Sequence, residues 1–260
     1  MLILISDPFD AGLPDQLAKF GEVTDDKGRL GEADVVLIRS KTKATKEYID
    51  SAPNLKLIIR GGVGTDNIDK PYAAEKGIVV RNTPKAPSIA VAELVLGMML
   101  AVCNHIIPAH LGMKEGKWLK KQLKRSELCR KTLCLVGLGN IAQVVAARAA
   151  AFGMKVQAFD PYVKSSELAE MKPSLADAVA GADYVSLHTP LTDETRGMIN
   201  ASIFDVMKDG VVVLNSGRGL CVYANDMVAA LEAGTLSTYA TDVWPFVPPP
   251  DDYPILSAPT

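Results

Sequence analysis

The sequence has almost no excess charge of either sign, because its 28 basic residues against 30 acidic ones give 260 residues a formal net charge of −2. Such a chain has no bulk attraction to nucleic acid or to an anionic membrane, so we expect neither partner. The four cysteines form no CxxC pair, and no His and Cys residues have the spacing of zinc ligands. We therefore expect reduced thiols, no metal site and a cytoplasmic location.

The sequence also lacks an uninterrupted apolar run of the length that a membrane span needs. The longest apolar stretch, residues 89–107, is interrupted by Glu93, Asn104 and His105, which favours a buried helix. The apolar start of the chain reaches Asp7 and Pro8 at once, so it predicts a first strand rather than a signal peptide. A hydrophobic content of 48% is ample for the buried cores of a globular protein.

The most informative segment is LCLVGLGNIAQVVAARAAAFGMKVQAFD, from Leu133 to Asp160. It predicts a strand, a glycine turn, a helix and a second strand that ends in a carboxylate. Gly137 permits the tight turn, and Gly139 lets phosphates approach the first N–H groups of the helix. Ala142 occupies the third position of the motif, which needs only a small residue. Asp160, 21 residues after Gly139, would bind ribose hydroxyls and repel a 2′-phosphate, so the segment predicts NAD rather than NADP.

Predicted strands and helices alternate along both halves of the chain, which indicates parallel sheets covered on both faces. In the first half we expect strands at 2–5, 35–38, 57–59 and 79–80, and helices at 13–20, 46–51, 71–76 and 88–104. In the second half, besides the dinucleotide segment, we expect strands at 184–188, 211–214 and 239–243 and helices at 201–206 and 225–233. We place the domain boundary between residues 98 and 99, ahead of a polar, lysine-rich segment at 112–130.

Ligands of open α/β sheets bind at the carboxyl ends of the strands, so the loops that follow the strands are the candidates for chemistry. Residues 60–67, RGGVGTDN, contain glycines whose N–H groups suit a carboxylate, although a plain turn explains them too. Residues 39–43, RSKTK, suit an anionic substrate or are merely a solvated charge run. Arg218, in the loop NSGRG, is placed to hold a carboxylate and polarise an adjacent carbonyl. Asp242 follows the last strand and could accept a hydrogen bond from a nicotinamide carboxamide.

Five segments in this order and spacing resemble the motifs of the D-2-hydroxyacid dehydrogenases: RGGVGTDNID, NTPKAPSIAVAELVLGMML, VGLGNIA with FGMKVQAFDPY, LHTPLTDETRGMIN, and LNSGRG. The phosphoglycerate dehydrogenase branch is the most similar, because IRSKTKAT resembles its substrate loop. The resemblance implies two Rossmann-like doubly wound parallel-sheet domains with catalysis in the cleft between them. Residues 1–98 would form a flavodoxin-like substrate domain that lacks its C-terminal closing helix, and residues 99–260 the NAD-binding domain. It also implies a homodimer, for which the helix at 89–107 and the region of Trp118 are candidates.

The resemblance assigns roles to individual residues. Arg218 matches the arginine that orients the substrate. The substrate-binding set comprises Arg39, Ser40, Gly62, Val63 and Gly64. The cofactor-binding set comprises Gly137, Gly139, Asn140, Ile141, Asp160, Thr189, Pro190, Thr195, Ser216, Gly217 and Asp242. His188 falls in the cofactor loop and does not match the catalytic histidine of the family.

The chain departs from the family pattern at the general acid/base. The family uses a histidine whose pKa is maintained by a glutamate, but the glutamate position, five residues after Asp242, is Val247. The histidine is expected shortly after the segment that begins at Tyr253, and the sequence ends first. We expect the chain to be a fragment whose continuation restores the histidine and the closing helix. Alternatively, it is an NAD-binding regulatory or scaffold module without turnover.

The expected reaction is hydride transfer between NAD and a small anionic D-2-hydroxy acid or 2-keto acid. 3-Phosphoglycerate, glyoxylate and hydroxypyruvate all remain open as substrates. A minor alternative is a formate dehydrogenase-like enzyme, because residues 242–254, DVWPFVPPPDDYP, are similar to a loop of those enzymes in which an uncharged residue replaces the glutamate.

Overall fold

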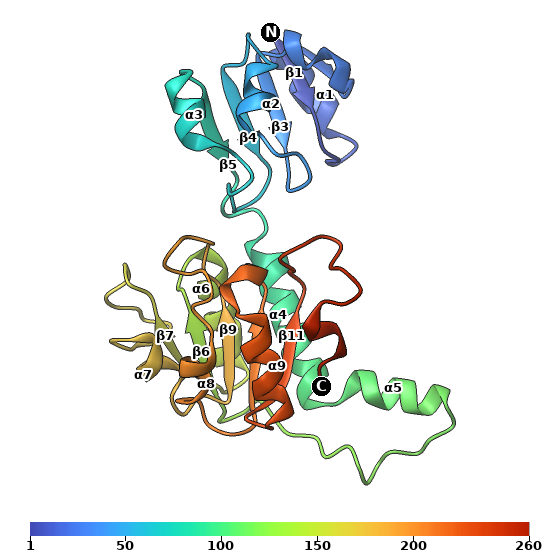
Figure 1. Ribbon diagram of the computed structural model, residues 1–260, viewed down its shortest axis with the longest axis vertical. Coiled ribbons are helices and arrows are strands. Elements are labelled where there is room, and N and C mark those ends of the chain that lie inside the picture. Colours follow the sequence, from blue (N-terminus) through green and yellow to red (C-terminus); the bar gives the residue numbers. More distant parts are fainter. Residues whose placement is uncertain (260) are drawn as a thin grey trace. The chain divides into compact units, whose positions relative to one another are not determined.

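The computed structural model describes residues 1–259, and contacts within the chain divide them into two units (Figure 1). The first unit is Met1–Pro87, and the second begins at Ser88. The predicted boundary between residues 98 and 99 falls inside helix α4, Ser88–Cys103, which belongs to the second unit because it packs on that unit's core. Residue 260, where the predicted second domain ends, lies outside the described residues.

The first unit contains a five-stranded parallel sheet with the strand order β2-β1-β3-β4-β5. Counted along the chain this is the order 2-1-3-4-5, which is the flavodoxin-like arrangement predicted for this half. The strands are β1 Leu2–Ile5, β2 Glu22–Thr24, β3 Val35–Ile38, β4 Leu57–Arg60 and β5 Val79–Asn82.

Helices cover both faces of this sheet, because alternate strand residues point to opposite sides. Leu4, Val36 and Ile58 pack in one cluster with residues of α2 (Lys46–Asp50) and α3 (Lys70–Glu75). On the other face, Ile3, Val35 and Leu37 pack against α1 (Leu13–Leu17). The prediction of a helix at 13–20 is split by the structure, since residues Ala18–Phe20 continue as a 3-10 turn.

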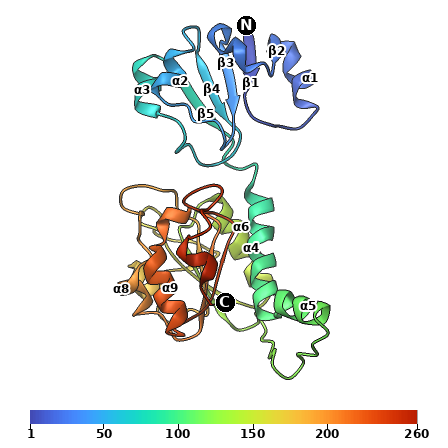
Figure 2. The ribbon, with the colours of Figure 1, turned by 45° about the vertical axis from the view of Figure 1, so that its right-hand side comes forward.

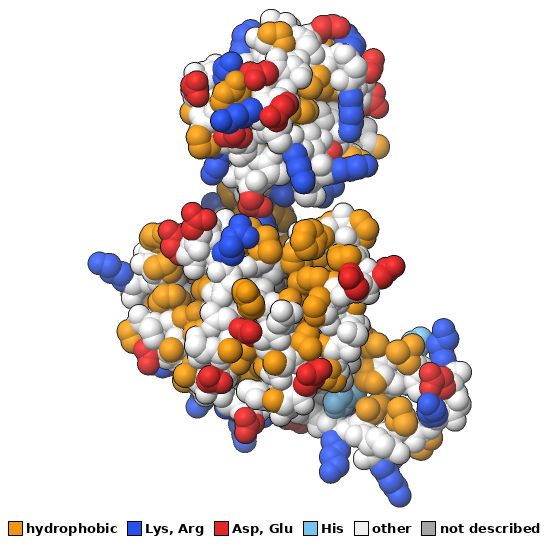
Figure 3. All heavy atoms as spheres, in the orientation of Figure 1, with side chains coloured by type: hydrophobic (Ala, Val, Ile, Leu, Met, Phe, Trp, Pro, Cys, Tyr) orange, Lys and Arg blue, Asp and Glu red, His pale blue; other side chains and the backbone are white. Residues whose placement is uncertain are grey.

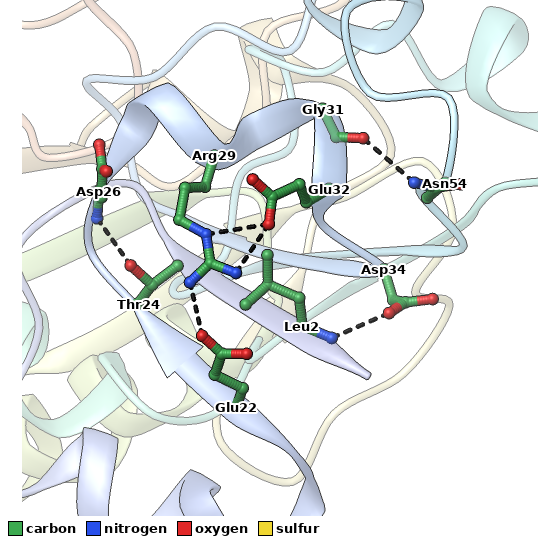
Figure 4. A network of polar contacts seen from close by, with 9 residues as sticks. All are labelled: Leu2, Glu22, Thr24, Asp26, Arg29, Gly31, Glu32, Asp34 and Asn54. Carbon is green, nitrogen blue, oxygen red and sulfur yellow. Dashed lines mark hydrogen bonds and ion pairs between the residues drawn. The ribbon is translucent and has the colours of Figure 1, made fainter.

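Strand β2 was not predicted, because Glu22–Thr24 is short, only partly buried and at the sheet edge. It is supported by polar contacts of Arg29, which lies in the 3-10 segment Lys27–Glu32 (Figure 4). The Arg29 guanidinium pairs with the carboxylates of Glu32 and Glu22, and these two carboxylates raise the pKa of Arg29. In the same region Asp34 accepts the Leu2 N–H at 2.9 Å.

The second unit contains a six-stranded sheet with the strand order β11-β10-β9-β6-β7-β8, all neighbours being parallel. Counted from β6 this is the order 3-2-1-4-5-6 of a dinucleotide-binding Rossmann fold. The strands are β6 Thr132–Val136, β7 Lys155–Phe159, β8 Glu170–Met171, β9 Tyr184–Leu187, β10 Val211–Asn215 and β11 Leu236–Thr241. The prediction of two doubly wound parallel-sheet regions is confirmed.

Two hydrophobic clusters sandwich the second sheet. Leu133 and Leu135 of β6 point to α4 and to α6 (Asn140–Ala151), which lie side by side in Figure 2. Cys134 and Val136 of the same strand point to the opposite cluster. Three helices contribute to that cluster: α7 Leu175–Val179, α8 Ala201–Phe204 and α9 Ala224–Glu232.

Two features of the second unit differ from the sequence prediction. Strand β11 begins at Leu236 and ends at Thr241, whereas the prediction was 239–243. The apolar pattern missed the start of the strand because Ser237 and Thr238 are polar, as residues of an edge strand often are. A further helix, α5 (Ile106–Lys114), follows α4 after His105, whose backbone is left-handed. Pro108 concealed this helix in the sequence, although proline in a first turn removes no helical hydrogen bond.

Among the described residues, no single helix has the length and apolar character needed to cross a membrane. The pair α4 and α5 meets the length and composition criteria only together, with a bend of 59° between the two helices.

Candidate functional site

The glycine turn after β6 has the backbone that a nucleotide site requires. Gly137 has φ of +88°, and its N–H donates to the Phe159 carbonyl at 2.8 Å. A Cβ at this position would lie 3.0 Å from the His188 carbonyl oxygen. Gly139 is the N-cap of α6 with φ of −75°, and a Cβ there would meet no atom within 4 Å. The backbone conformation therefore requires glycine at residue 137. At residue 139 nothing in the fold excludes a side chain, and the space beside the helix end is open to a ligand.

Helix α6 begins with free N–H groups, because Gly139 has no side chain to cap them. Its first residues, Asn140 and Ile141, lie at this positive end of the helix dipole. Ala142 is fully buried in the core against β6, in agreement with the need for a small residue there. The helix start can accept an anionic group such as a pyrophosphate.

Asp160 follows β7, and its carboxylate holds the glycine turn. Its Oδ2 accepts the Leu138 N–H at 2.8 Å, and its Oδ1 accepts the Tyr162 N–H at 2.9 Å. The carboxylate thus connects the end of β7 to the glycine turn after β6. This contact fixes the carboxylate beside the glycine turn.

The loop after β9 lies between the glycine turn and the loop after β10. The carbonyl of His188 faces Gly137, and the carbonyl of Thr189 lies 3.1 Å from the Cβ that Gly217 lacks. Further along the loop, Thr195 Oγ1 donates to the Pro190 carbonyl at 2.7 Å, which closes the turn. The predicted cofactor residues of three loops are therefore adjacent at one edge of the sheet.

The His188 side chain is partly buried and contacts the strand that precedes it. Its Nε2 lies 2.9 Å from Ser186 Oγ, and burial lowers the pKa of the imidazole to about 4. The ring is neutral at pH 7 and does not serve as a general acid there.

The turn that carries Arg218 is held by Asn215, a fully buried polar residue at the end of β10. Its Oδ1 accepts the Gly217 N–H at 3.0 Å, and its Nδ2 donates to the Arg218 carbonyl at 3.0 Å and to the Tyr239 hydroxyl at 3.1 Å. The Arg218 guanidinium donates to the Gly217 carbonyl at 2.8 Å. Neither Asn215 nor Tyr239 was among the predicted site residues. A polar residue that ends an otherwise apolar strand was the available signal for Asn215.

The two remaining cofactor residues suit a bound group. Ser216 Oγ is buried and makes no hydrogen bond within residues 1–259, so a donor or acceptor from a ligand would satisfy it. The pKa of Asp242 is raised because the surrounding protein partly desolvates its carboxyl group. The helix end, the open space at Gly139 and the unsatisfied Ser216 hydroxyl together fit a dinucleotide. Within the same residues, no three His, Cys, Asp or Glu side chains group as metal ligands.

The predicted substrate-binding residues lie in two neighbouring loops of the first unit, after β3 and β4. The two loops are joined where the Gly61 N–H donates to the Ile38 carbonyl at 2.8 Å. The Gly62 N–H donates to Thr83 Oγ1 at 2.8 Å, and Asn82 Nδ2 donates to the Val63 carbonyl at 2.6 Å. Gly64 continues this glycine loop, and Arg39 and Ser40 are exposed in the other.

Comparison with known proteins identifies the family. Residues 96–260 match the model of the D-isomer specific 2-hydroxyacid dehydrogenase, NAD binding domain. The chain belongs to this family. It is 45% identical over 223 residues to a hydroxypyruvate reductase of Thermotoga maritima, covering 86% of this chain and 73% of that protein. It is 39% identical over 267 residues to a D-3-phosphoglycerate dehydrogenase of Methanocaldococcus jannaschii, covering 98% of this chain and 51% of that protein.

A solved structure agrees with these relatives. The D-lactate dehydrogenase of Aquifex aeolicus, in complex with NAD and lactic acid, superimposes with a TM-score of 0.85 at 30% identity, covering 94% of this chain and 77% of that one. The predictions of family, enzyme class and NAD as cofactor are confirmed. The chain spans about half the length of the phosphoglycerate dehydrogenases that it matches.

Proposed function

We propose that this chain takes part in hydride transfer between NAD and a D-2-hydroxy acid or its 2-keto acid. The observation that carries the proposal is the contact of the loop after β9 with both Gly137 and Gly217. This loop brings the glycine turn and the Arg218 turn to the same edge of one sheet. The Rossmann unit from Ser88 onward would bind the cofactor, and the Met1–Pro87 unit would bind the acid.

Each proposed step uses a group of this chain. NAD, when bound, supplies the nicotinamide carbon that accepts or donates the hydride. Ser216, Gly217 and Asp242 would orient the nicotinamide, while the N–H groups at the start of α6 bind the pyrophosphate. The Arg218 guanidinium would hold the substrate carboxylate and polarise its carbonyl. The glycine loop from Gly62 to Gly64 would bind the carboxylate of the acid through the N–H groups of Val63 and Gly64, because the Gly62 N–H donates to Thr83 Oγ1.

The assay is NADH binding by fluorescence, followed by NADH oxidation with hydroxypyruvate, glyoxylate and phosphohydroxypyruvate. Formate with NAD is measured alongside them. Residues 1–260 and the full natural translation product are compared. We expect NADH binding by both and preferential turnover of one keto acid by the latter. Absence of NADH binding by either protein would contradict the proposal, and reduction of NAD by formate alone would replace it.

One observation favours a second candidate, a regulatory or scaffold module that binds NAD without turnover. Val247 occupies the position of the family's glutamate, and its side chain is 89% exposed and aliphatic, so it cannot accept a proton. NADH binding without oxidation of any of the three acids by the full translation product would favour this module over the dehydrogenase.

We also propose that the chain forms a homodimer through α5 and the following segment. Figure 3 shows hydrophobic side chains on this part of the second unit. Ile107, Leu111 and Met113 are exposed on the helix, and Trp118 beyond it is 73% exposed. Such an apolar surface is typical of an interface. Light scattering should give a dimer for the wild type and a monomer for the Ile107→Ser/Trp118→Ser variant.

A further inference from the structure

A buried carboxylate holds the basic loop that follows β3. Asp7, two residues after the end of β1, is only 4% exposed. Its Oδ2 accepts the Arg39 N–H at 2.6 Å and the Thr42 N–H at 3.1 Å, and its Oδ1 accepts the Thr42 hydroxyl at 2.7 Å. One side chain therefore satisfies three donors of the loop.

A second side chain binds the carbonyl groups of the same two residues. Asn67, in the loop between β4 and α3, donates through Nδ2 to the Arg39 carbonyl at 2.7 Å and to the Thr42 carbonyl at 2.6 Å. The Asn67 carbonyl in turn accepts the Ala44 N–H at 2.8 Å. Asp7 and Asn67 thus bind donors and acceptors of one short loop.

The charge state of Asp7 suits this arrangement. Burial by itself would raise the pKa of its carboxyl, but hydrogen bonds from Thr42 and Arg39, with a smaller contribution from Lys27, lower the pKa below its ordinary value. The group is ionised at pH 7, so its bonds to the loop are charge-assisted.

Most side chains of the loop are exposed, and Arg39 makes one contact within the unit, from Nη1 to the Pro8 carbonyl at 3.3 Å. Arg39, Ser40 and Lys41 are exposed, so the loop presents two positive charges and a hydroxyl to solvent. An exposed four-residue loop ordinarily loses conformational freedom when it binds a ligand, and a loop held beforehand loses less. The contacts of Asp7 and Asn67 with the loop, together called the clamp, therefore favour chiefly the binding of an anion to these three side chains.

We propose that Asp7 and Asn67 are positioning residues that hold Arg39, Ser40 and Lys41 to bind a phosphate group on the acid substrate. This inference rests on the proposed function, since it assumes that the ligand is a 2-hydroxy acid. It selects the phosphorylated acid among the substrates left open above, and it adds to that function two residues that act through the loop without touching substrate.

The test compares two probes, 3-phosphoglycerate and glycolate, titrated into the wild type and variants and followed by NMR chemical shifts. Asp7→Asn replaces one of the two acceptor oxygens, and Asn67→Asp places a carboxylate against two carbonyl groups. We expect each change to raise the Kd of 3-phosphoglycerate about tenfold and that of glycolate less than twofold. The amides of Arg39 and Thr42 should exchange hydrogen faster in both variants.

The matched controls are Asp25→Asn and Asn225→Asp, which make the same chemical changes at exposed positions. Both should bind 3-phosphoglycerate as the wild type does. Thr42→Val, which removes only the hydroxyl bond to Asp7, is a milder change that tests the clamp if the first two variants do not fold. It should raise the Kd of 3-phosphoglycerate about threefold.

Three results would overturn the inference: faster amide exchange with unchanged 3-phosphoglycerate binding, an equal loss of both probes, or a wild type that binds 3-phosphoglycerate no better than glycolate. NADH binding is measured on the same samples and should not change. A wild type that binds 3-phosphoglycerate through this loop but does not bind NADH would contradict the proposed dehydrogenase and still support the clamp.

Discussion

Replacement by alanine at the two glycines of the turn between β6 and α6 is expected to have different effects, one on stability and the other on NADH affinity. Gly137 has a positive φ, and its missing Cβ would lie 3.0 Å from the His188 carbonyl oxygen and 3.2 Å from its carbon. Gly139 has an extended backbone and open space on the side of its Cβ. One glycine is therefore required by the fold, and the other only by a ligand.

Gly137→Ala should destabilise the second unit by about 2 kcal/mol, because a left-handed alanine costs roughly 1–2 kcal/mol and the contact with His188 adds to it. Gly139→Ala should leave stability unchanged or raise it by about 0.5 kcal/mol, because alanine reduces the entropy of the unfolded chain. The same methyl group would stand where the pyrophosphate approaches α6. Loss of one charged hydrogen bond, about 2–3 kcal/mol, raises the Kd of NADH roughly thirtyfold to 140-fold.

The assays are urea unfolding by tryptophan fluorescence and NADH titration. Both tryptophans, Trp118 and Trp244, lie in the second unit, so the fluorescence reports its unfolding alone. Gly97→Ala, at an exposed position within α4, is the control and should change NADH affinity in neither direction. Wild-type NADH affinity in Gly139→Ala would refute the placement of the pyrophosphate, and wild-type stability in Gly137→Ala would refute the account of the turn.

Three further outcomes are expected. The folded-state pKa of His188, about 4, lies below the unfolded value of 6.5, so the unfolded chain binds more protons between these values. Stability should fall by up to about 3 kcal/mol as the pH drops through that window, and urea titrations of His188→Gln should lack this component. Asp160→Ser should raise the Kd of NADH about tenfold and lower that of NADPH, since the carboxylate that repels a 2′-phosphate is removed; unchanged selectivity in fluorescence titrations would contradict this. Exposed Cys129 should react with a thiol reagent in the folded protein, whereas Cys134 should not, because burial raises the pKa of its thiol to about 12. Mass spectrometry of the labelled peptides measures the reaction at each cysteine.

Local sequence patterns predicted the elements that have strong periodicity or glycine punctuation. Strands β1 and β3 were predicted with their observed bounds, and the turn from Gly137 to Ala142 with its neighbouring strands. The pattern failed at short edge elements such as β2 and β8, where few residues are buried and tertiary contacts such as those of Arg29 decide. Helix α5 was not predicted, because proline breaks a helix at most positions. Pro108 lies in the first turn of α5, where proline is tolerated.

The sequence by itself determined the alternation of strands and helices, the NAD-type turn and the family, because these depend on residues close together in the chain. Only the tertiary structure revealed that Asn215 and Tyr239 hold the Arg218 turn and that Asp7 and Asn67 hold the loop at Arg39. Each of these contacts joins groups that folding brings together from different strands or loops. A buried polar side chain needs a partner, and which partner it finds depends on the strand order of the sheet, which no local pattern records.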